Sequence, residues 1–121
     1  KDFTDRFVIT LNDKAIGIVG CVCMDKDNLI FGLYYQISRK YWGCGYATEA
    51  ARAIVSYVLD KYPTATIRAE VVSINQASIA VLKKIGLNQT HIEEKGFKKN
   101  NLELDLIHFS NIDFTVPAGL H

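Results

Sequence analysis

The hydrophobic pattern of the chain changes its period after about residue 38, and this change limits the folds that it can adopt. Before that point, segments 6–11, 15–24 and 29–38 are rich in β-branched and aromatic residues, which favours three strands. The turns between them are too short for parallel crossovers, so an antiparallel meander is predicted. Over residues 45–61 the apolar side chains recur at helical spacing, which predicts an amphipathic helix.

The second half of the chain alternates between the two patterns. Residues 66–72 are predicted to form a strand and residues 75–85 a helix, for which Asn75 is a suitable N-cap. Two more strands are expected near 89–97 and 102–110. The predicted order is βββ-α-β-α-ββ, a mixed and mostly antiparallel twisted sheet of the α/β (α+β) class. The first helix should join two parallel strands through a right-handed crossover.

Size and charge narrow the classes of function. The 121 residues suit one domain that covers residues 1–121. A formal net charge of +1 provides no broad field for nucleic acid or an anionic membrane, and the longest apolar run, 15–24, is too short to span a bilayer. No signal-peptide pattern opens the chain, and its three cysteines lack metal spacing. We therefore expect a cytoplasmic protein with reduced thiols and no metal site.

The most informative segment, residues 41–50, lies between the third predicted strand and the first helix. Gly43 and Gly45 let the backbone turn tightly, with its N–H groups pointing inward. Together with the positive end of the helix dipole, these donors predict an anion site, to which Thr48 could add a hydroxyl. The spacing matches neither a Rossmann fingerprint nor a Walker loop, although a plain strand–helix connection would need glycines too.

Two motifs make this turn more specific. Residues 42–47 resemble the pyrophosphate-binding motif of the GNAT N-acetyltransferases, and the string Tyr-Trp-Gly-Cys-Gly-Tyr-Ala-Thr-Glu-Ala is typical of the ribosomal-protein N-terminal acetyltransferase branch. Residues 73–87 resemble the same branch, with a Gly-Leu pair where Gly-Phe is usual. The resemblance covers about residues 7–109. The N-terminal strand and two helices of the family are expected to be missing.

The resemblance implies the acyl-CoA acyltransferase fold without that N-terminal part. It also implies transfer of an acetyl group from acetyl-CoA to a primary amine, by direct attack in a ternary complex. The acceptor would be a protein N-terminal α-amine or a small-molecule amine, without nucleic acid or membrane, and an exposed sheet edge leaves a homodimer open. A non-catalytic acyl-CoA-binding module is the alternative, because Leu82 replaces a tyrosine that many members use at the leaving thiolate.

The resemblance assigns three groups of residues to the cofactor. The strand before the turn should bind the pantetheine arm through its main chain. The turn and the start of the first helix should bind the pyrophosphate, and the start of the second helix should add polar side chains. In chain order, these residues are Gln36, Ile37 and Ser38, then Trp42, Gly43, Cys44, Gly45, Tyr46, Ala47 and Thr48, and finally Asn75 and Ser78.

Two residues are candidates for the chemistry. Glu70 is the candidate base, acting through water, because related N-terminal acetyltransferases carry a glutamate in this strand. A surface glutamate is an equally good interpretation. Ser78 would face the sulfur, although its spacing from Asn75 also suits a helix start. An ordinary structural or surface role is the better interpretation of the other candidates, namely Tyr34, Tyr35, Trp42, Glu49, His91, His108 and His121.

Overall fold

The computed structural model describes residues 4–111 and confirms the predicted order of elements. Its helices include a short 3-10 helix, Arg39–Tyr41, that the sequence pattern did not predict. In this range the strands are β1 (Thr4–Leu11), β2 (Lys14–Asp25), β3 (Ile30–Ile37), β4 (Thr66–Val72), β5 (Asn88–Lys99) and β6 (Leu102–Ser110), and the α-helices are α1 (Tyr46–Lys61) and α2 (Gln76–Lys84). Within the described range, no helix combines the length and the apolar character that crossing a lipid bilayer requires.

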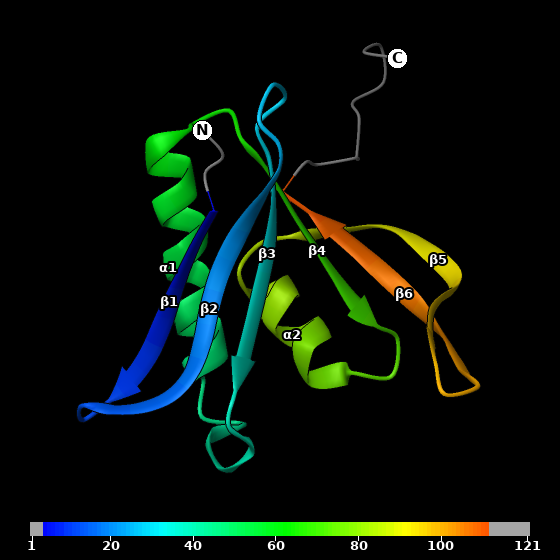
Figure 1. Cartoon of the computed structure of the whole chain (residues 1–121), viewed down its shortest axis with the longest axis horizontal. Coiled ribbons are helices and arrows are strands. Elements are labelled where there is room, and N and C mark those ends of the chain that lie inside the picture. Colours follow the sequence, from blue (N-terminus) through cyan, green and yellow to red (C-terminus); the bar gives the residue numbers. More distant parts are fainter. Residues whose placement is uncertain (1–3, 112–121) are drawn as a thin grey trace.

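The strands form one sheet with the order β1-β2-β3-β4-β6-β5 (Figure 1). The strands β1, β2 and β3 form the predicted antiparallel meander, and β4, β6 and β5 are also antiparallel to their neighbours. Only β3 and β4 are parallel among the pairs of the described sheet, and α1 lies between them in the chain. The predicted parallel crossover is therefore present.

The parallel pair β3–β4 separates soon after it begins. Residues 30–32 pair with residues 66–68, and the described part of the chain shows no β3–β4 pair beyond them. Figure 1 shows the two strands diverging from this point, with α2 beside the opening. As a result, the second half of β3 has a strand partner on its β2 side alone among the described strands.

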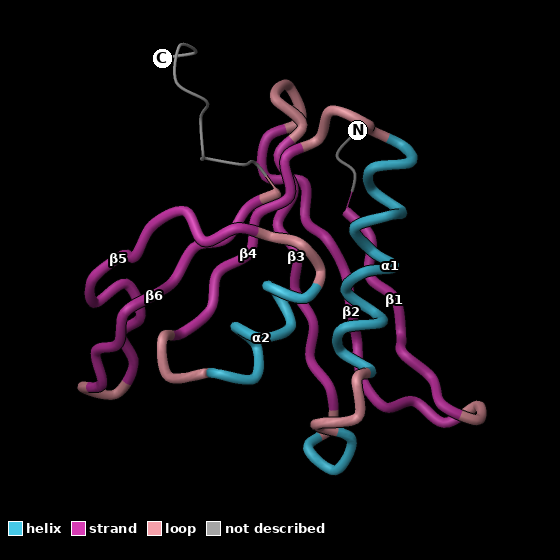
Figure 2. Tube along the Cα trace, turned by 180° about the vertical axis from the view of Figure 1, so that it is seen from behind, coloured by secondary structure: helices cyan, strands magenta, loops and turns pink. Residues whose placement is uncertain are grey.

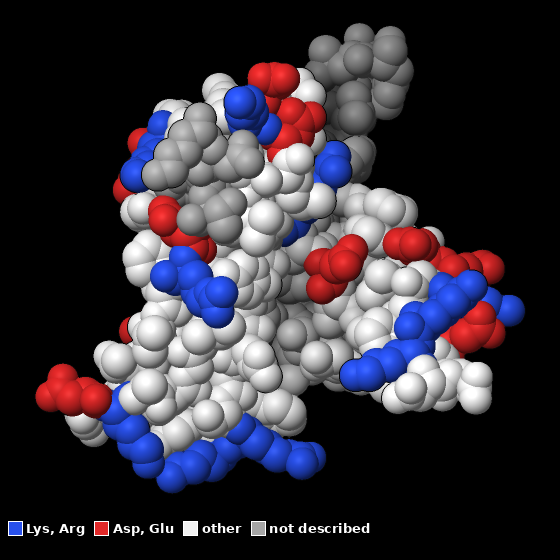
Figure 3. All heavy atoms as spheres, viewed as in Figure 1, with Lys and Arg blue, Asp and Glu red and all other residues white. Residues whose placement is uncertain are grey.

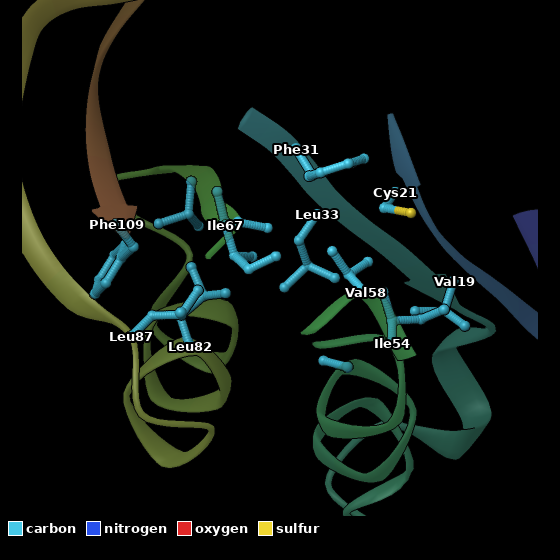
Figure 4. Packing of buried hydrophobic residues seen from close by; sticks show 14 residues of the cluster. Val19, Cys21, Phe31, Leu33, Ile54, Val58, Ile67, Leu82, Leu87 and Phe109 are labelled. Atoms are coloured by element: carbon cyan, nitrogen blue, oxygen red, sulfur yellow. The ribbon is translucent and has the colours of Figure 1, made fainter. Parts of the chain in front are cut away.

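Both helices pack on the same face of the sheet, and the core lies between helices and sheet (Figures 2 and 4). In α1, the buried residues Ala51, Ile54 and Val58 recur at helical spacing and face β2 and β3. Leu82 of α2 packs near Phe109 of β6. Complete burial of one such aliphatic side chain contributes about 1.5–3 kcal/mol, so this face fixes both helices to the sheet.

Candidate cofactor-binding cleft

A cavity of about 420 Å³ opens where the end of β3, the glycine turn and α2 meet. All of the predicted cofactor residues except Ser38 and Cys44 line this cavity. The lining residues are Tyr35, Gln36 and Ile37 from β3, Tyr41, Trp42, Gly43, Gly45, Tyr46, Ala47 and Thr48 from the turn and α1, and Asn75, Ala77, Ser78, Ala80, Val81 and Lys84 around α2. Residues 35–48 and residues 75–84, which are distant in the sequence, therefore enclose one space.

The glycine turn has the backbone conformation that an anion site needs. Gly43 and Gly45 have φ angles of +78° and +84°, which side chains other than glycine rarely adopt. A Cβ atom on either would meet no protein atom within 4 Å, so the conformation rather than crowding favours glycine. Gly45 is the N-cap of α1 and offers no side-chain acceptor. The first N–H groups of α1 therefore have no partner within the helix, and their residues line the cavity.

Trp42 fixes this turn to β3. Its indole Nε1 donates a hydrogen bond of 2.7 Å to the Ile37 carbonyl, while 59% of the residue is exposed. The guanidinium of Arg39 lies 5.5 Å from the centre of the Trp42 ring, and Lys40 follows it in the 3-10 helix. Figure 3 shows Lys and Arg side chains gathered at this end of the molecule. The turn therefore lies in positively charged surroundings, which favours a phosphate ligand.

Along β3, the main-chain N–H and C=O groups of every second residue point towards the cleft. The Ser38 N–H donates to the Ile16 carbonyl on the β2 side, and the Thr66 N–H donates to the Leu29 carbonyl on the β4 side, each at 2.8 Å. Because main-chain groups alternate along a strand, these bonds direct Tyr35 and Ile37 towards the cleft. The Ser38 N–H is used within the sheet, whereas the Ile37 carbonyl lies on the cleft side and accepts the hydrogen bond from Trp42 Nε1.

The N-terminus of α2 forms the opposite wall. The Asn75 side chain caps the helix, with its Oδ1 accepting a hydrogen bond of 3.1 Å from the Ser78 N–H. Ser78 Oγ lies 2.9 Å from the Tyr35 hydroxyl, so a side chain of β3 meets α2 across the cleft. Burial raises the pKa of the Tyr35 phenol above its ordinary value, and the hydrogen bond to Ser78 opposes this effect. The phenol therefore keeps its proton at neutral pH.

A smaller cavity of about 130 Å³ continues between the diverging strands. Tyr35 and Ser78 line both cavities, and Glu70 of β4 lines the smaller one. The Glu70 side chain is 61% exposed, and its Oε2 lies 3.9 Å from Nδ1 of His108 on β6. Leu82 also lines this space, but only 2% of the residue is exposed and it carries no polar group. The two cavities therefore lie on either side of the Tyr35–Ser78 pair, with the glycine turn lining one and a carboxylate on β4 lining the other.

The fold and this cleft agree with the comparison to known families. The family described as acetyltransferase (GNAT) domain matches residues 1–88, which is more than half of the chain. The chain belongs to the GNAT acetyltransferase family.

Curated relatives and solved structures are similar to this GNAT chain over part of their length. The FsC-acetyl coenzyme A-N(2)-transacetylase of Aspergillus fumigatus is 42% identical over 59 residues, which are 49% of this chain and 24% of that protein. The uncharacterized N-acetyltransferase p20 of Bacillus licheniformis is 27% identical over 108 residues, which are 88% of this chain and 61% of that protein. The chain thus spans about a quarter to three fifths of the length of these relatives.

Two solved structures have the same fold at low sequence identity. RimL, a ribosomal L7/L12 alpha-N-protein acetyltransferase in complex with coenzyme A, superposes with a TM-score of 0.84 at 14% identity, over 91% of this chain and 62% of that one. An F149A mutant of the spermidine N-acetyltransferase SpeG from Vibrio cholerae superposes with a TM-score of 0.79 at 16% identity, over 87% of this chain and 63% of that one. The expected missing N-terminal part of the family domain stays a prediction.

Several residues that the sequence analysis considered lie outside the cavity of this GNAT chain. Cys44 is exposed, and its Sγ donates to the Trp42 carbonyl at 3.7 Å. Glu49 is exposed in the first turn of α1. His108 lies between carboxylates, with Nε2 2.9 Å from Glu93 Oε1, and stacks on His91 at 4.3 Å. Within residues 4–111, no cluster of three or more His, Cys, Asp or Glu is arranged to hold a metal ion.

Tyr35 lines both cavities, although the sequence analysis favoured an ordinary structural role for it over a catalytic one. Its position two residues before Ile37, on the same face of β3, was the available signal. The contact with Ser78 spans 43 residues of sequence, so no local pattern could reveal it.

Proposed function

We propose that this chain, as one domain over residues 1–121, acetylates a primary amine with acetyl-CoA by direct attack in a ternary complex. The observation that carries the proposal is the pair of neighbouring cavities described above, which share Tyr35 and Ser78 as lining residues. One end lies at the unpartnered N–H groups of α1, the other at Glu70, and Tyr35 and Ser78 lie at the junction. A donor that binds along the first cavity would bring its thioester to this junction, where an amine could approach from the second.

The glycine turn is proposed to bind the pyrophosphate of acetyl-CoA. Charge at a helix N-terminus contributes about 0.3–1 kcal/mol per interaction, so several donors must act together. The turn offers the first N–H groups of α1, the Thr48 hydroxyl and the nearby cations Arg39 and Lys40. On the cleft side of β3, the main-chain groups of Tyr35 and the N–H of Ile37 can bind the amide groups of the pantetheine arm as a strand partner would, while the Ile37 carbonyl accepts from Trp42. These residues fit the cofactor without a metal.

Glu70 is proposed as the base that removes the proton of the acceptor. A lysine-like amine with a pKa near 10.4 costs about 4–5 kcal/mol to deprotonate at pH 7, whereas an α-amine with a pKa near 7.8 costs about 1 kcal/mol. A positioned base is therefore most valuable for an alkyl amine. Because the Glu70 side chain is largely exposed, it would act through an ordered water molecule.

The acceptor is proposed as a protein N-terminal α-amine or a small-molecule amine. RimL is named as a protein N-terminal acetyltransferase and SpeG as a spermidine acetyltransferase, so both acceptor types occur on this fold. The turn motif of residues 41–50 favours the branch of RimL. An odd number of cysteines, three, fits reduced thiols better than a disulfide framework, so a cytoplasmic location is proposed. A homodimer through a sheet edge stays a prediction.

The test is release of free thiol from acetyl-CoA by the full-length protein, with a panel of peptides, polyamines and aminoglycosides. We expect turnover with at least one amine. Glu70→Gln and Ser78→Ala should each lower kcat about 10–100-fold while coenzyme A still binds. Glu103→Gln is the control, because this carboxylate pairs with Lys98 on the β5–β6 hairpin at 3.7 Å and does not line the cleft.

Two results would contradict parts of this proposal. Binding of coenzyme A without turnover with any amine would favour the non-catalytic acyl-CoA-binding module. Normal turnover in both the Glu70 and the Ser78 variants would remove the catalytic assignment but leave the transferase activity.

A further inference from the structure

We propose that Tyr35 is a positioning residue for the leaving thiolate, because its hydroxyl donates to Ser78 Oγ and so directs the single Ser78 hydroxyl proton at the coenzyme A sulfur. This inference rests on the acetyl transfer proposed above. It assigns to the Tyr35 phenol on β3 a part in stabilising the departing sulfur. The apolar side chain of Leu82 on α2 has no polar group for this role.

The geometry brings the two hydroxyls together at the junction of the cleft. Tyr35 comes from β3 and Ser78 from the first turn of α2, and their oxygens are 2.9 Å apart. Both residues line both cavities. Leu82 lies one helical turn after Ser78 on the same face of α2, but it is buried in the core. Among the residues shared by both cavities, Tyr35 and Ser78 thus provide the side-chain donors.

The direction of the hydrogen bond follows from the number of protons. A serine hydroxyl carries one proton and two acceptor lone pairs. If Ser78 donates to the sulfur, its oxygen can still accept from Tyr35. If Ser78 instead donated to Tyr35, a lone pair would face the developing thiolate and repel it. Burial raises the pKa of the Tyr35 phenol, so this donor stays neutral while the thiolate forms.

The reaction balances without a proton from Tyr35. The amine nitrogen attacks the acetyl carbonyl carbon, so the C–N bond forms and the C–S bond then breaks, with its electron pair going to sulfur. Before the attack, Glu70 takes one proton of the ammonium through water. The second nitrogen proton is lost from the tetrahedral intermediate and passes to solvent water. Tyr35 and Ser78 keep their protons, and the thiolate leaves stabilised by the Ser78 hydrogen bond. A hydrogen bond to a charged acceptor is stronger than one between neutral groups, so the pair favours the thiolate over the thioester.

A structural role would have different consequences. The Tyr35 oxygen also lies 3.5 Å from the Ser78 carbonyl oxygen, so the phenol could simply hold β3 against α2. Loss of such a connection would lower stability and cofactor affinity. It would not change how strongly the site prefers a thiolate over a thiol, and this preference is the property to measure.

The first test compares the binding of coenzyme A with that of an analogue in which hydrogen replaces the thiol, between pH 7 and pH 9. A site that favours the thiolate lowers the pKa of the bound thiol, so its affinity for coenzyme A rises with pH while that for the analogue does not. We expect this ratio of affinities to rise about tenfold in the wild type and about threefold in Tyr35→Phe, with almost no rise in Ser78→Ala. Tyr57→Phe is the control, because it removes a phenol that bonds Asp5 Oδ2 at 2.7 Å, away from the cleft.

The second test is a double-mutant cycle on turnover with the best amine of the panel. Tyr35→Phe should lower kcat about tenfold and change the KM for acetyl-CoA less than about twofold. The double variant with Ser78→Ala should lose no more than Ser78→Ala alone, since both act on one hydrogen bond. A wild-type pH response in Tyr35→Phe, or losses that multiply in the double variant, would overturn the inference alone. Absence of coenzyme A binding by the wild type would overturn it together with the proposed function.

Discussion

Replacing Gly45 by alanine separates the stability of the glycine turn from its binding role. At φ +84°, an alanine adopts the left-handed conformation, which costs about 1–2 kcal/mol for an L-residue. The methyl group meets no protein atom within 4 Å, so no clash adds to this cost. Alanine also lowers the conformational entropy of the unfolded chain, which offsets about 0.4–1 kcal/mol of this cost. We therefore expect a net loss of about 1 kcal/mol in the free energy of unfolding, or about 3–5 °C in Tm.

Gly45 lines the cavity, and a methyl group there would occupy space that no protein atom fills within 4 Å. A diphosphate that binds the main chain at this turn needs close approach, which a Cβ prevents. We expect the Kd for coenzyme A to rise about 10–100-fold, well beyond any effect of stability on a protein that is still folded. Gly86→Ala is the matched control. Gly86 has a φ of +94° and no neighbour within 4 Å, but it lies after α2 and does not line the cavity.

Urea denaturation of the ligand-free variants measures stability, and isothermal titration with coenzyme A measures binding. Both alanine variants should lose similar stability, while only the variant at position 45 should lose affinity. Equal coenzyme A affinity in the two variants would refute the placement of the diphosphate at this turn. A much larger loss of stability at position 45 than at position 86 would refute the argument that its Cβ has free space.

Three further predictions follow from local contacts. Asn75→Ala removes the N-cap of α2 and should lower stability by about 1 kcal/mol in thermal melts, whereas Asn75→Asp should keep most of it; an unchanged Tm in the alanine variant would contradict this. The exposed Cys44 should react with thiol reagents several-fold more slowly when coenzyme A is bound, and equal labelling rates would count against the site. Side-chain and main-chain hydrogen bonds from Asn28 lower the pKa of Asp25, so this contribution to stability is present above the ordinary pKa and disappears as pH falls through the lowered one. Asn28→Ala should raise the pKa of Asp25 towards its ordinary value in an NMR titration, and an unmoved titration would argue that these bonds are not the cause.

Most of the secondary structure could be predicted because it depends on neighbouring residues. The predicted limits of β4 and β6 agree with the structure, since Pro63 and Asn75 lie close to the ends of β4 and Asn residues border β6. The strand β5 extends beyond its predicted limits to Asn88–Lys99, because most of its side chains are exposed and leave no alternation to follow. The 3-10 helix Arg39–Tyr41 was missed because three residues are too few for a period.

The residues of the candidate site could be predicted only where they belong to one short segment of the sequence. The glycine turn and the N-cap Asn75 follow from spacing within one segment, and Ser78 was assigned from the family resemblance. Gly43, Gly45, Asn75 and Ser78 all line the cavity. The main-chain role of Ser38 was harder to judge, because the strand partner that uses its N–H is Ile16, 22 residues earlier in the chain.

The sequence by itself determined the order of strands and helices and the place of the positive-φ turn, because periodicity and backbone conformation are properties of short segments. Only the tertiary structure decided where β3 and β4 separate, and therefore that a cleft exists between them. It also decided that Tyr35 reaches Ser78 and that Glu70 lies beside His108. These contacts depend on the pairing of distant strands and on the packing of α2 against the sheet, which arise from the whole hydrophobic core rather than from any one segment.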